Sequence, residues 1–149
     1  TLFTYNLGNE TIHDISFFDY DNKCNLIQES YFYYFENRLY FGEKLKYTWI
    51  NDNITRIYYY DSNNYLTMEE TLDYDNKLQY HILPEFSVFD YCKNNLIKKT
   101  SKIDWGDGII TYATESYIMK YNEFDLPVSI TKVIGDGHLG IFYSNYEYD

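Results

Sequence analysis

A short unit recurs along this chain of 149 residues: an aromatic residue, then a polar turn rich in Asn and Asp, then a Leu or Ile. One version of the unit, Asp-Tyr-Asp-Asn-Lys, stands at 19–23 and again at 73–77. A unit of about 14 residues, at roughly 3.3 Å per residue, accommodates one long strand and one tight turn. The recurrence therefore predicts a series of hairpins. The aromatic anchors of the units are Tyr20, Tyr34, Trp49, Tyr60, Tyr74, Tyr91, Tyr121 and Tyr148.

The residues just before the anchors alternate in polarity. Side chains two positions before an anchor are all apolar or aromatic, whereas those one position before are mostly polar. Successive side chains of a strand point to opposite faces of the sheet, so each anchor and its partner two positions earlier share a face. We expect this face to be the core and the acidic residues of the other face to be exposed. These acidic residues are Asp19, Asp73, Asp90 and Glu147.

Asn and Asp dominate the predicted turns. Both residues tolerate the left-handed backbone region and bond their own main chain, so they can build turns in a chain that has only 7 Gly. We therefore interpret Asp21 and Asp75 as turn residues and not as catalytic groups. The segment 81–90, which contains Pro84, interrupts the rhythm and is expected to be an excursion of a few residues from the sheet.

These patterns predict a single all-β domain over residues 1–149. The expected fold is an antiparallel up-and-down meander of about ten to twelve strands, because short turns join consecutive strands. The sheet should be strongly curved or form an incompletely closed barrel. No helix longer than a single turn is expected.

Charge and motif content exclude several classes of function. The formal net charge is −11, with 12 Lys and Arg against 23 Asp and Glu, which disfavours binding to nucleic acid or to an anionic membrane. No nucleotide, cofactor or metal-binding motif is present, and the three histidines share no metal-ligand spacing, so neither a cofactor nor a metal is expected. Cys24 and Cys92 form no CxxC motif. We expect two unpaired thiols, and a disulfide between them is the alternative.

The stretch IDWGDGI at 103–109 contains the best candidate for a ligand-binding surface. It places Trp105 between Asp104 and Asp107 at a predicted turn tip, where a large aromatic side chain is unusual. An exposed indole ring can stack on a sugar or pack on a partner protein, while the two carboxylates accept hydrogen bonds from hydroxyl groups. In the alternative interpretation, Trp105 folds back over the edge of its own sheet.

The run Y-x-Y-D-x-N-x-x-L resembles the YD (RHS-type) repeats of bacterial surface proteins. The segments LDYDNK (72–77), YCKNNLIKKT (91–100), YIMKYNEFDLPVSI (117–130) and the terminal YEYD resemble a family of uncharacterised exported lipoproteins from gut Bacteroidetes, described as porin-like in fold. The resemblance implies an all-β chain in the periplasm or at the outer-membrane surface. It also implies that the membrane is contacted only through a lipid anchor lost with the leader. It implies no activity and no catalytic residues.

Three functions are compatible with the sequence. We expect a secreted or surface-anchored, non-catalytic binding or adhesion module whose partner at the cell surface is a glycan or a protein. A hydrolase with a site assembled from distant strands is the first alternative, because the lack of a local motif does not exclude a site formed in space. A purely structural segment of a larger surface protein is the second alternative.

Overall fold

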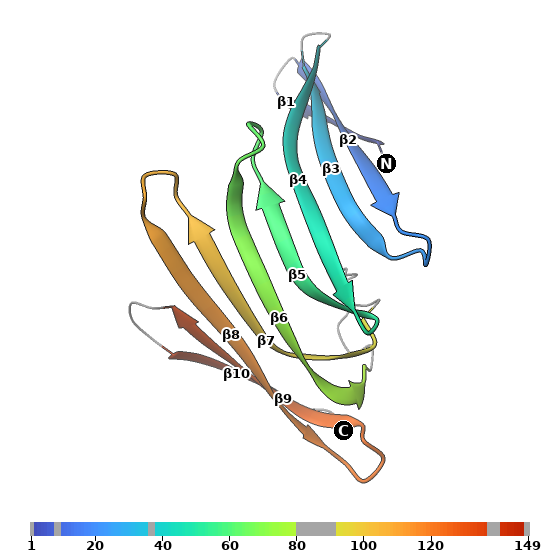
Figure 1. The fold of residues 1–149 in the computed structure, drawn as a ribbon, viewed down its shortest axis with the longest axis vertical. Coiled ribbons are helices and arrows are strands. Elements are labelled where there is room, and N and C mark those ends of the chain that lie inside the picture. Colours follow the sequence, from blue (N-terminus) through green and yellow to red (C-terminus); the bar gives the residue numbers. More distant parts are fainter. Residues whose placement is uncertain (1, 8–9, 36–37, 80–91, 137–140, 148–149) are drawn as a thin grey trace.

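The described residues form one antiparallel sheet of ten strands, as a computed structural model shows (Figure 1). The description covers all residues except 1, 8–9, 36–37, 80–91, 137–140 and 148–149, and leaves out the side chains of 2–7, 10–13, 35, 136 and 141–147. The strands are β1 (Leu2–Leu7), β2 (Glu10–Tyr20), β3 (Leu26–Phe35), β4 (Arg38–Ile50), β5 (Asn53–Tyr60), β6 (Leu66–Leu78), β7 (Asn94–Asp104), β8 (Ile110–Tyr121), β9 (Pro127–Asp136) and β10 (Ile141–Glu147).

The order of the strands in the sheet is their order in the chain, from β1 to β10, and the described residues contain no helix. Figure 1 shows the sheet twisting steadily from the N-terminal hairpin to the C-terminal one. The prediction of an all-β up-and-down meander is therefore confirmed, and the strands that the structure describes are ten, all in a single sheet. The described part of the chain holds no helix with the length and hydrophobicity needed to span a lipid bilayer.

One face of the sheet, here called the inner face, carries the core. It presents the buried side chains of Tyr47 on β4, Ile57 on β5 and Leu72 on β6. Ile54, beside a bulge in the β4–β5 pair, is completely buried in the same cluster. Burial of each large aliphatic side chain contributes about 1.5–3 kcal/mol. Residues of the opposite, outer face alternate with these and are exposed, among them Thr48, Arg56, Thr71 and Lys102.

The predicted burial pattern is confirmed at three anchors, on β4, β6 and β8. The anchors Trp49, Tyr74 and Tyr121 are half-buried on the inner face, and Asp19 and Asp73 are exposed. Asp90, Tyr91 and Tyr148, the side chain of Glu147 and the predicted excursion at 81–90 lie outside the description.

The predicted pattern is wrong at three anchors, Tyr20, Tyr34 and Tyr60. Tyr34 is five positions from Glu29, which lies opposite the core-packed Leu45, so Tyr34 is on the outer face. Tyr20 is 58% exposed and Phe18 is 38% exposed, because the core cluster gathers on β4–β6 and does not extend to the end of β2. Tyr60 lies on the outer face, where the ammonium of Lys44 is 4.7 Å from its ring centroid, whereas Tyr59 packs against the core. Three consecutive tyrosines end β5, so side-chain type did not reveal which of them faces inward.

Three turns share one geometry, in which an Asp or Asn follows the last residue of a strand. The Oδ1 atom of Asp21 accepts hydrogen bonds from the amides of Lys23 (2.8 Å) and Asn25 (2.9 Å), two and four residues later. Asp61 and Asn122 make the same pair of bonds. The residue three positions after the acceptor adopts a left-handed backbone, with φ between 61° and 64°. The interpretation of Asp21 as a turn residue is thus confirmed.

The second Asp-Tyr-Asp-Asn-Lys copy differs from its prediction, because 73–77 lies inside β6 and not in a hairpin turn. Asp75 still accepts a bond from the amide two residues later, Lys77, at 2.9 Å. Its second amide donor is Asn95, at 3.3 Å, which lies 20 residues further on and not four. The chain therefore inserts 16 residues into a turn that otherwise keeps its closing contacts. Bulges at Tyr74 absorb the resulting irregularity.

The C-terminal base of this long connection is attached to the neighbouring β4–β5 turn. Asn94 donates its amide to Oδ1 of Asn53, and Asn53 donates its Nδ2 to Oδ1 of Asn94, both at 2.9 Å. Cys92 is 5% exposed, and its Sγ accepts the amide of Ile54 at 3.4 Å. These contacts close one end of the core with residues distant in sequence.

Both cysteines are free thiols, as expected, but their environments differ: Cys24 is exposed in the β2–β3 turn and Cys92 is buried. We expect one thiol of the native protein to react rapidly with a disulfide reagent and the second only after denaturation. Cys24→Ser should abolish the rapid reaction, with Cys92→Ser as the matched variant that leaves it intact. Two rapid thiols would show that Cys92 is not held in the core.

Candidate ligand-binding site

Carboxylates on the inner face accept hydrogen bonds from tyrosine hydroxyls and form a row across the sheet. A carboxylate removed from water needs such donors, because burial without a partner is costly. The pairs are Tyr31 and Tyr47 with Glu29, Tyr59 with Glu70, and Tyr117 with Glu115.

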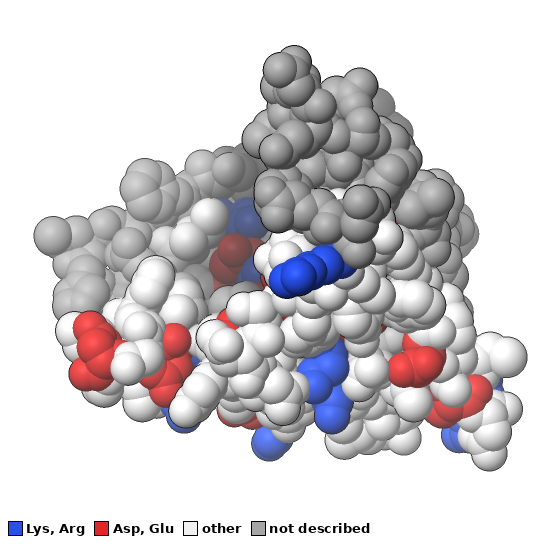
Figure 2. Space-filling view, turned by 90° about the horizontal axis from the view of Figure 1, so that it is seen from above, with Lys and Arg blue, Asp and Glu red and all other residues white. Residues whose placement is uncertain are grey.

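The C-terminal part of the row is neutralised by lysines. Lys99 lies between Glu70 (3.3 Å) and Glu115 (3.6 Å), and Lys132 lies 3.1 Å from Glu115. Burial would raise the pKa of Glu115, but the hydrogen bonds from Tyr117 and Lys132 and the charges of the two lysines hold it below its usual value. Figure 2 shows acidic and basic side chains interspersed on the face that it displays, including a group of both signs in its recessed part.

The N-terminal part of the row has no such cation. Glu29 is only 9% exposed, and its two oxygens accept the hydroxyls of Tyr31 and of Tyr47, the latter at 2.7 Å. All 12 Lys and Arg of the chain belong to the described residues, and none of them forms an ion pair with Glu29. Glu29 is therefore a buried carboxylate whose partners are neutral phenols.

The tyrosines of the row are held in their neutral form. Burial, followed by the hydrogen bond to Glu29, raises the pKa of Tyr31 and Tyr47 above the usual value. Burial and then the charge of Glu70 raise the pKa of Tyr59. Burial and the hydrogen bond to Glu115 do the same for Tyr117. A neutral phenol donates its proton to the carboxylate, so these groups act as fixed donors.

A pocket of about 440 Å³ opens beside Tyr31 on β2, β3 and β4. Two carboxylates line it from different strands, Asp14 on β2 and Glu43 on β4. The β3–β4 bulge places Gly42 at the pocket wall, where an added Cβ would lie 3.4 Å from the Tyr31 carbonyl oxygen and 3.6 Å from Cδ1 of Tyr33. We call this hollow the inner-face pocket; its lining residues are Asp14, Ser16, Tyr31, Phe32, Tyr33, Gly42 and Glu43.

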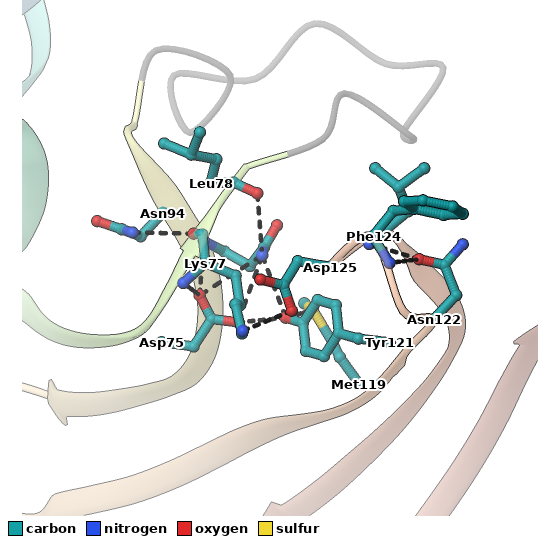
Figure 3. Close-up of polar contacts among 11 residues, drawn as sticks. Asp75, Lys77, Leu78, Asn94, Met119, Tyr121, Asn122, Phe124 and Asp125 are labelled. Atoms are coloured by element: carbon teal, nitrogen blue, oxygen red, sulfur yellow. Dashed lines mark hydrogen bonds and ion pairs between the residues drawn. The ribbon is translucent and has the colours of Figure 1, made fainter.

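A further tyrosine–carboxylate contact lies at the end of the sheet that carries the β8–β9 turn (Figure 3). Asp75 on β6 accepts the hydroxyl of Tyr121 on β8, and Lys77 pairs with Asp125 of the turn after β8. Asn95 also donates to Asp75, at 3.3 Å. The polar atoms of this cluster satisfy one another across three strands, so the cluster is a structural clamp and not a free binding site.

The residues predicted as a ligand surface lie together in the turn between β7 and β8. Trp105 is 64% exposed, and its indole N–H donates to Oγ1 of Thr111 at 3.1 Å. Asp104 accepts the amide of Gly106 at 2.9 Å, and Asp107 accepts the amide of Ile109 at 3.0 Å. Gly106 and Gly108 supply the positive φ values of 82° and 83° that this turn requires. The indole is thus exposed in a fixed orientation, and both carboxylates brace the loop.

Sequence reasoning missed the inner-face pocket, although one signal was present. The tripeptide Glu-Ser-Tyr occurs twice, at 29–31 and 115–117, and both copies place a tyrosine hydroxyl on the carboxylate two residues earlier. The pocket itself depends on which strands pair and on the bulge at Gly42, and neither can be read from residue type.

Comparison with known proteins identifies no relative: no family model, no curated protein and no solved structure matches the chain.

Proposed function

We propose that the chain is an exported, non-catalytic binding module that recognises a glycan through the inner-face pocket. The observation that supports this proposal is the pocket lining, where tyrosine rings and carboxylates meet in one hollow of about 440 Å³. Aromatic rings stack on the apolar faces of sugars, and carboxylates accept hydrogen bonds from sugar hydroxyls. Export and display at the cell surface rest on the sequence resemblance alone.

Tyr33 and Tyr40 give the pocket a preformed aromatic platform. Their rings are stacked, with centroids 5.3 Å apart and an interplanar angle of 10°, and Tyr33 remains 41% exposed. Mutual stacking fixes both rings before a ligand arrives, so binding costs little further side-chain entropy. An exposed and immobilised ring at the rim of a polar hollow favours a flat, partly apolar ligand such as a pyranose.

Replacing Tyr33 with Ala should weaken glycan binding at least tenfold while leaving the melting temperature nearly unchanged, because the ring is partly exposed and outside the core. A glycan array screened with the purified protein identifies ligands, and calorimetry then compares the variants. Tyr20→Ala is the matched control, since Tyr20 is 58% exposed and does not line the pocket. Wild-type affinity in Tyr33→Ala for every glycan that binds would overturn the assignment to this pocket.

The β7–β8 turn is the second surface proposed for the same function. The specific observation is the exposed indole of Trp105, oriented by Thr111. Trp105→Ala should leave stability nearly unchanged and abolish binding if the turn, with Asp104 and Asp107, is the site. If Trp105→Ala loses binding and Tyr33→Ala does not, the binding site is the β7–β8 turn and not the inner-face pocket. A loss of roughly 3–5 kcal/mol of stability would instead make Trp105 structural. An array without any bound glycan would contradict the proposed function itself.

A hydrolase is the second candidate function, because Asp14 and Glu43 come from separate strands and line the same pocket. Two carboxylates that flank a sugar are the groups that glycosidic cleavage requires. Incubation of the array ligands with the protein, followed by product analysis, separates the two functions. Intact glycans support a binding module, whereas cleavage that disappears in Glu43→Gln supports the enzyme.

A further inference from the structure

The two Glu-Ser-Tyr copies occupy equivalent places in the sheet but have opposite electrostatic surroundings. In the copy at 115–117, Lys99 lies opposite Glu115 on the preceding strand and Lys132 lies opposite Tyr117 on the following strand. Both ammonium groups contact Glu115, and that of Lys132 is also 5.6 Å from the centroid of the Tyr117 ring. This copy therefore shows how the motif accommodates a primary ammonium.

In the copy at 29–31 the corresponding positions carry different residues. Phe18 lies opposite Glu29 on the preceding strand, and Glu43 lies opposite Tyr31 on the following strand. An apolar side chain thus stands in the place of Lys99, and an acidic one stands in the place of Lys132. The cation that balances the C-terminal copy is absent from the N-terminal copy, and one more negative charge is present.

Among the residues that the structure describes, no lysine or arginine supplies the missing cation. Asp14, Glu29 and Glu43 form no ion pair with any of the 12 Lys and Arg, all of which belong to the described residues. The nearest lysine in sequence, Lys44, lies on the outer face and bonds Asn64 of the β5–β6 turn. The inner-face pocket therefore combines two acidic lining residues and an adjacent buried carboxylate with aromatic rings.

We infer that the inner-face pocket binds a ligand that carries a primary ammonium group. This ammonium contacts the Glu43 carboxylate and the rings of Tyr31 and Tyr33. In the other copy, the ammonium of Lys132 makes the same kinds of contact with Glu115 and with the ring of Tyr117. Carboxylates and aromatic faces both attract an ammonium, and a partly enclosed site strengthens both interactions. This inference rests on the proposed function, so the ligand is a glycan with unacetylated amino sugars. A glycan of neutral sugars would leave the acidic lining without a counter-charge.

The inference is tested with two probes that differ only in the amino group: glucosamine oligomers and N-acetylglucosamine oligomers of the same length. The unacetylated oligomer should bind at least tenfold more tightly, since acetylation removes the charge and one charge-assisted hydrogen bond. Added salt should weaken its binding, because part of the attraction is between charges near solvent. Equal affinities for the two oligomers would overturn the inference and leave glycan binding intact.

Variants connect this preference to the pocket. Glu43→Gln should reduce affinity for the glucosamine oligomer about tenfold or more, with little change in melting temperature because Glu43 is exposed. Glu123→Gln is the matched control, since Glu123 is an exposed acid in the β8–β9 turn, outside the pocket. Equal losses in both variants would reveal general attraction to an acidic protein and contradict a specific site. Asp14→Asn provides a second acidic position if Glu43→Gln folds poorly.

A lysine-rich peptide tests the same ammonium chemistry on a protein ligand. Tight binding of the peptide without binding of either sugar oligomer would overturn the glycan assignment. Failure of all three probes, together with an array on which other glycans bind, would overturn the ammonium assignment alone. Binding of the glucosamine oligomer that Glu43→Gln abolishes and Glu123→Gln preserves is the result that supports the inference.

Discussion

Raising the pH above about 10 should unfold the protein steeply. An unfolded tyrosine loses its proton near pH 10, whereas burial raises the pKa of Tyr47, Tyr59 and Tyr74 in the folded state. Their contribution to stability is therefore fully present below pH 10 and is lost as the pH rises toward the folded-state pKa values. For Tyr47, which is 8% exposed, the loss is about 1.4 kcal/mol per pH unit. Solvent screening makes the half-buried Tyr59 and Tyr74 contribute less.

Urea unfolding followed from neutral pH to strongly alkaline pH measures this loss. Tyr47→Phe removes one titrating group, so its stability should decline less steeply, although it starts lower because Glu29 loses a donor. Tyr112→Phe is the control, as Tyr112 is 57% exposed. A wild-type stability that stays flat through the titration of the phenols would show that these tyrosines are not buried as neutral donors.

Ile57→Ala should cost about 2–5 kcal/mol of unfolding free energy, a large share of the stability of a domain of this size. Ile57 is 2% exposed and belongs to a cluster with few other buried hydrophobic side chains, so the neighbours cannot easily fill the space. Ile118→Ala, at a position on β8 that is 58% exposed, should change stability by no more than about 0.5 kcal/mol. Similar effects for the two variants, measured by urea unfolding, would place the core elsewhere.

The strand and turn pattern could be predicted because both depend on local chemistry. Asn and Asp at strand ends fix the turns through their own side chains, as Asp21, Asp61 and Asn122 do. The face of each strand could be predicted only in part, because bulges shift the alternation at Thr55 on β5 and at Thr67 on β6. One extra residue in a strand moves every later side chain to the other face, and residue type gives no warning of it.

The candidate site was harder to predict than the fold, because its residues come from strands whose pairing register is a property of the whole sheet. Asp14 and Glu43 are 29 positions apart and meet only through β3. Trp105, by contrast, can be identified from its turn alone, where the six consecutive residues 104–109 determine the local backbone. Sequence reasoning is therefore biased toward candidate sites in loops.

The turn that closes through Asp75 and Asn95 has a consequence for how chains of this type change over evolution. It keeps the amide contacts of a four-residue turn while the connection is five times longer, and the entropic cost of that longer loop is only roughly 1.4 kcal/mol. The amide contacts of Asp75 join the two ends of the connection, and the bulges at Tyr74 confine the irregularity to the end of the β6–β7 pair. The turns at Asp21, Asp61 and Asn122 are built the same way and should accept grafted segments of similar length. In such a sheet, the segment at the tip of one hairpin can be replaced during evolution without a change in the other hairpins.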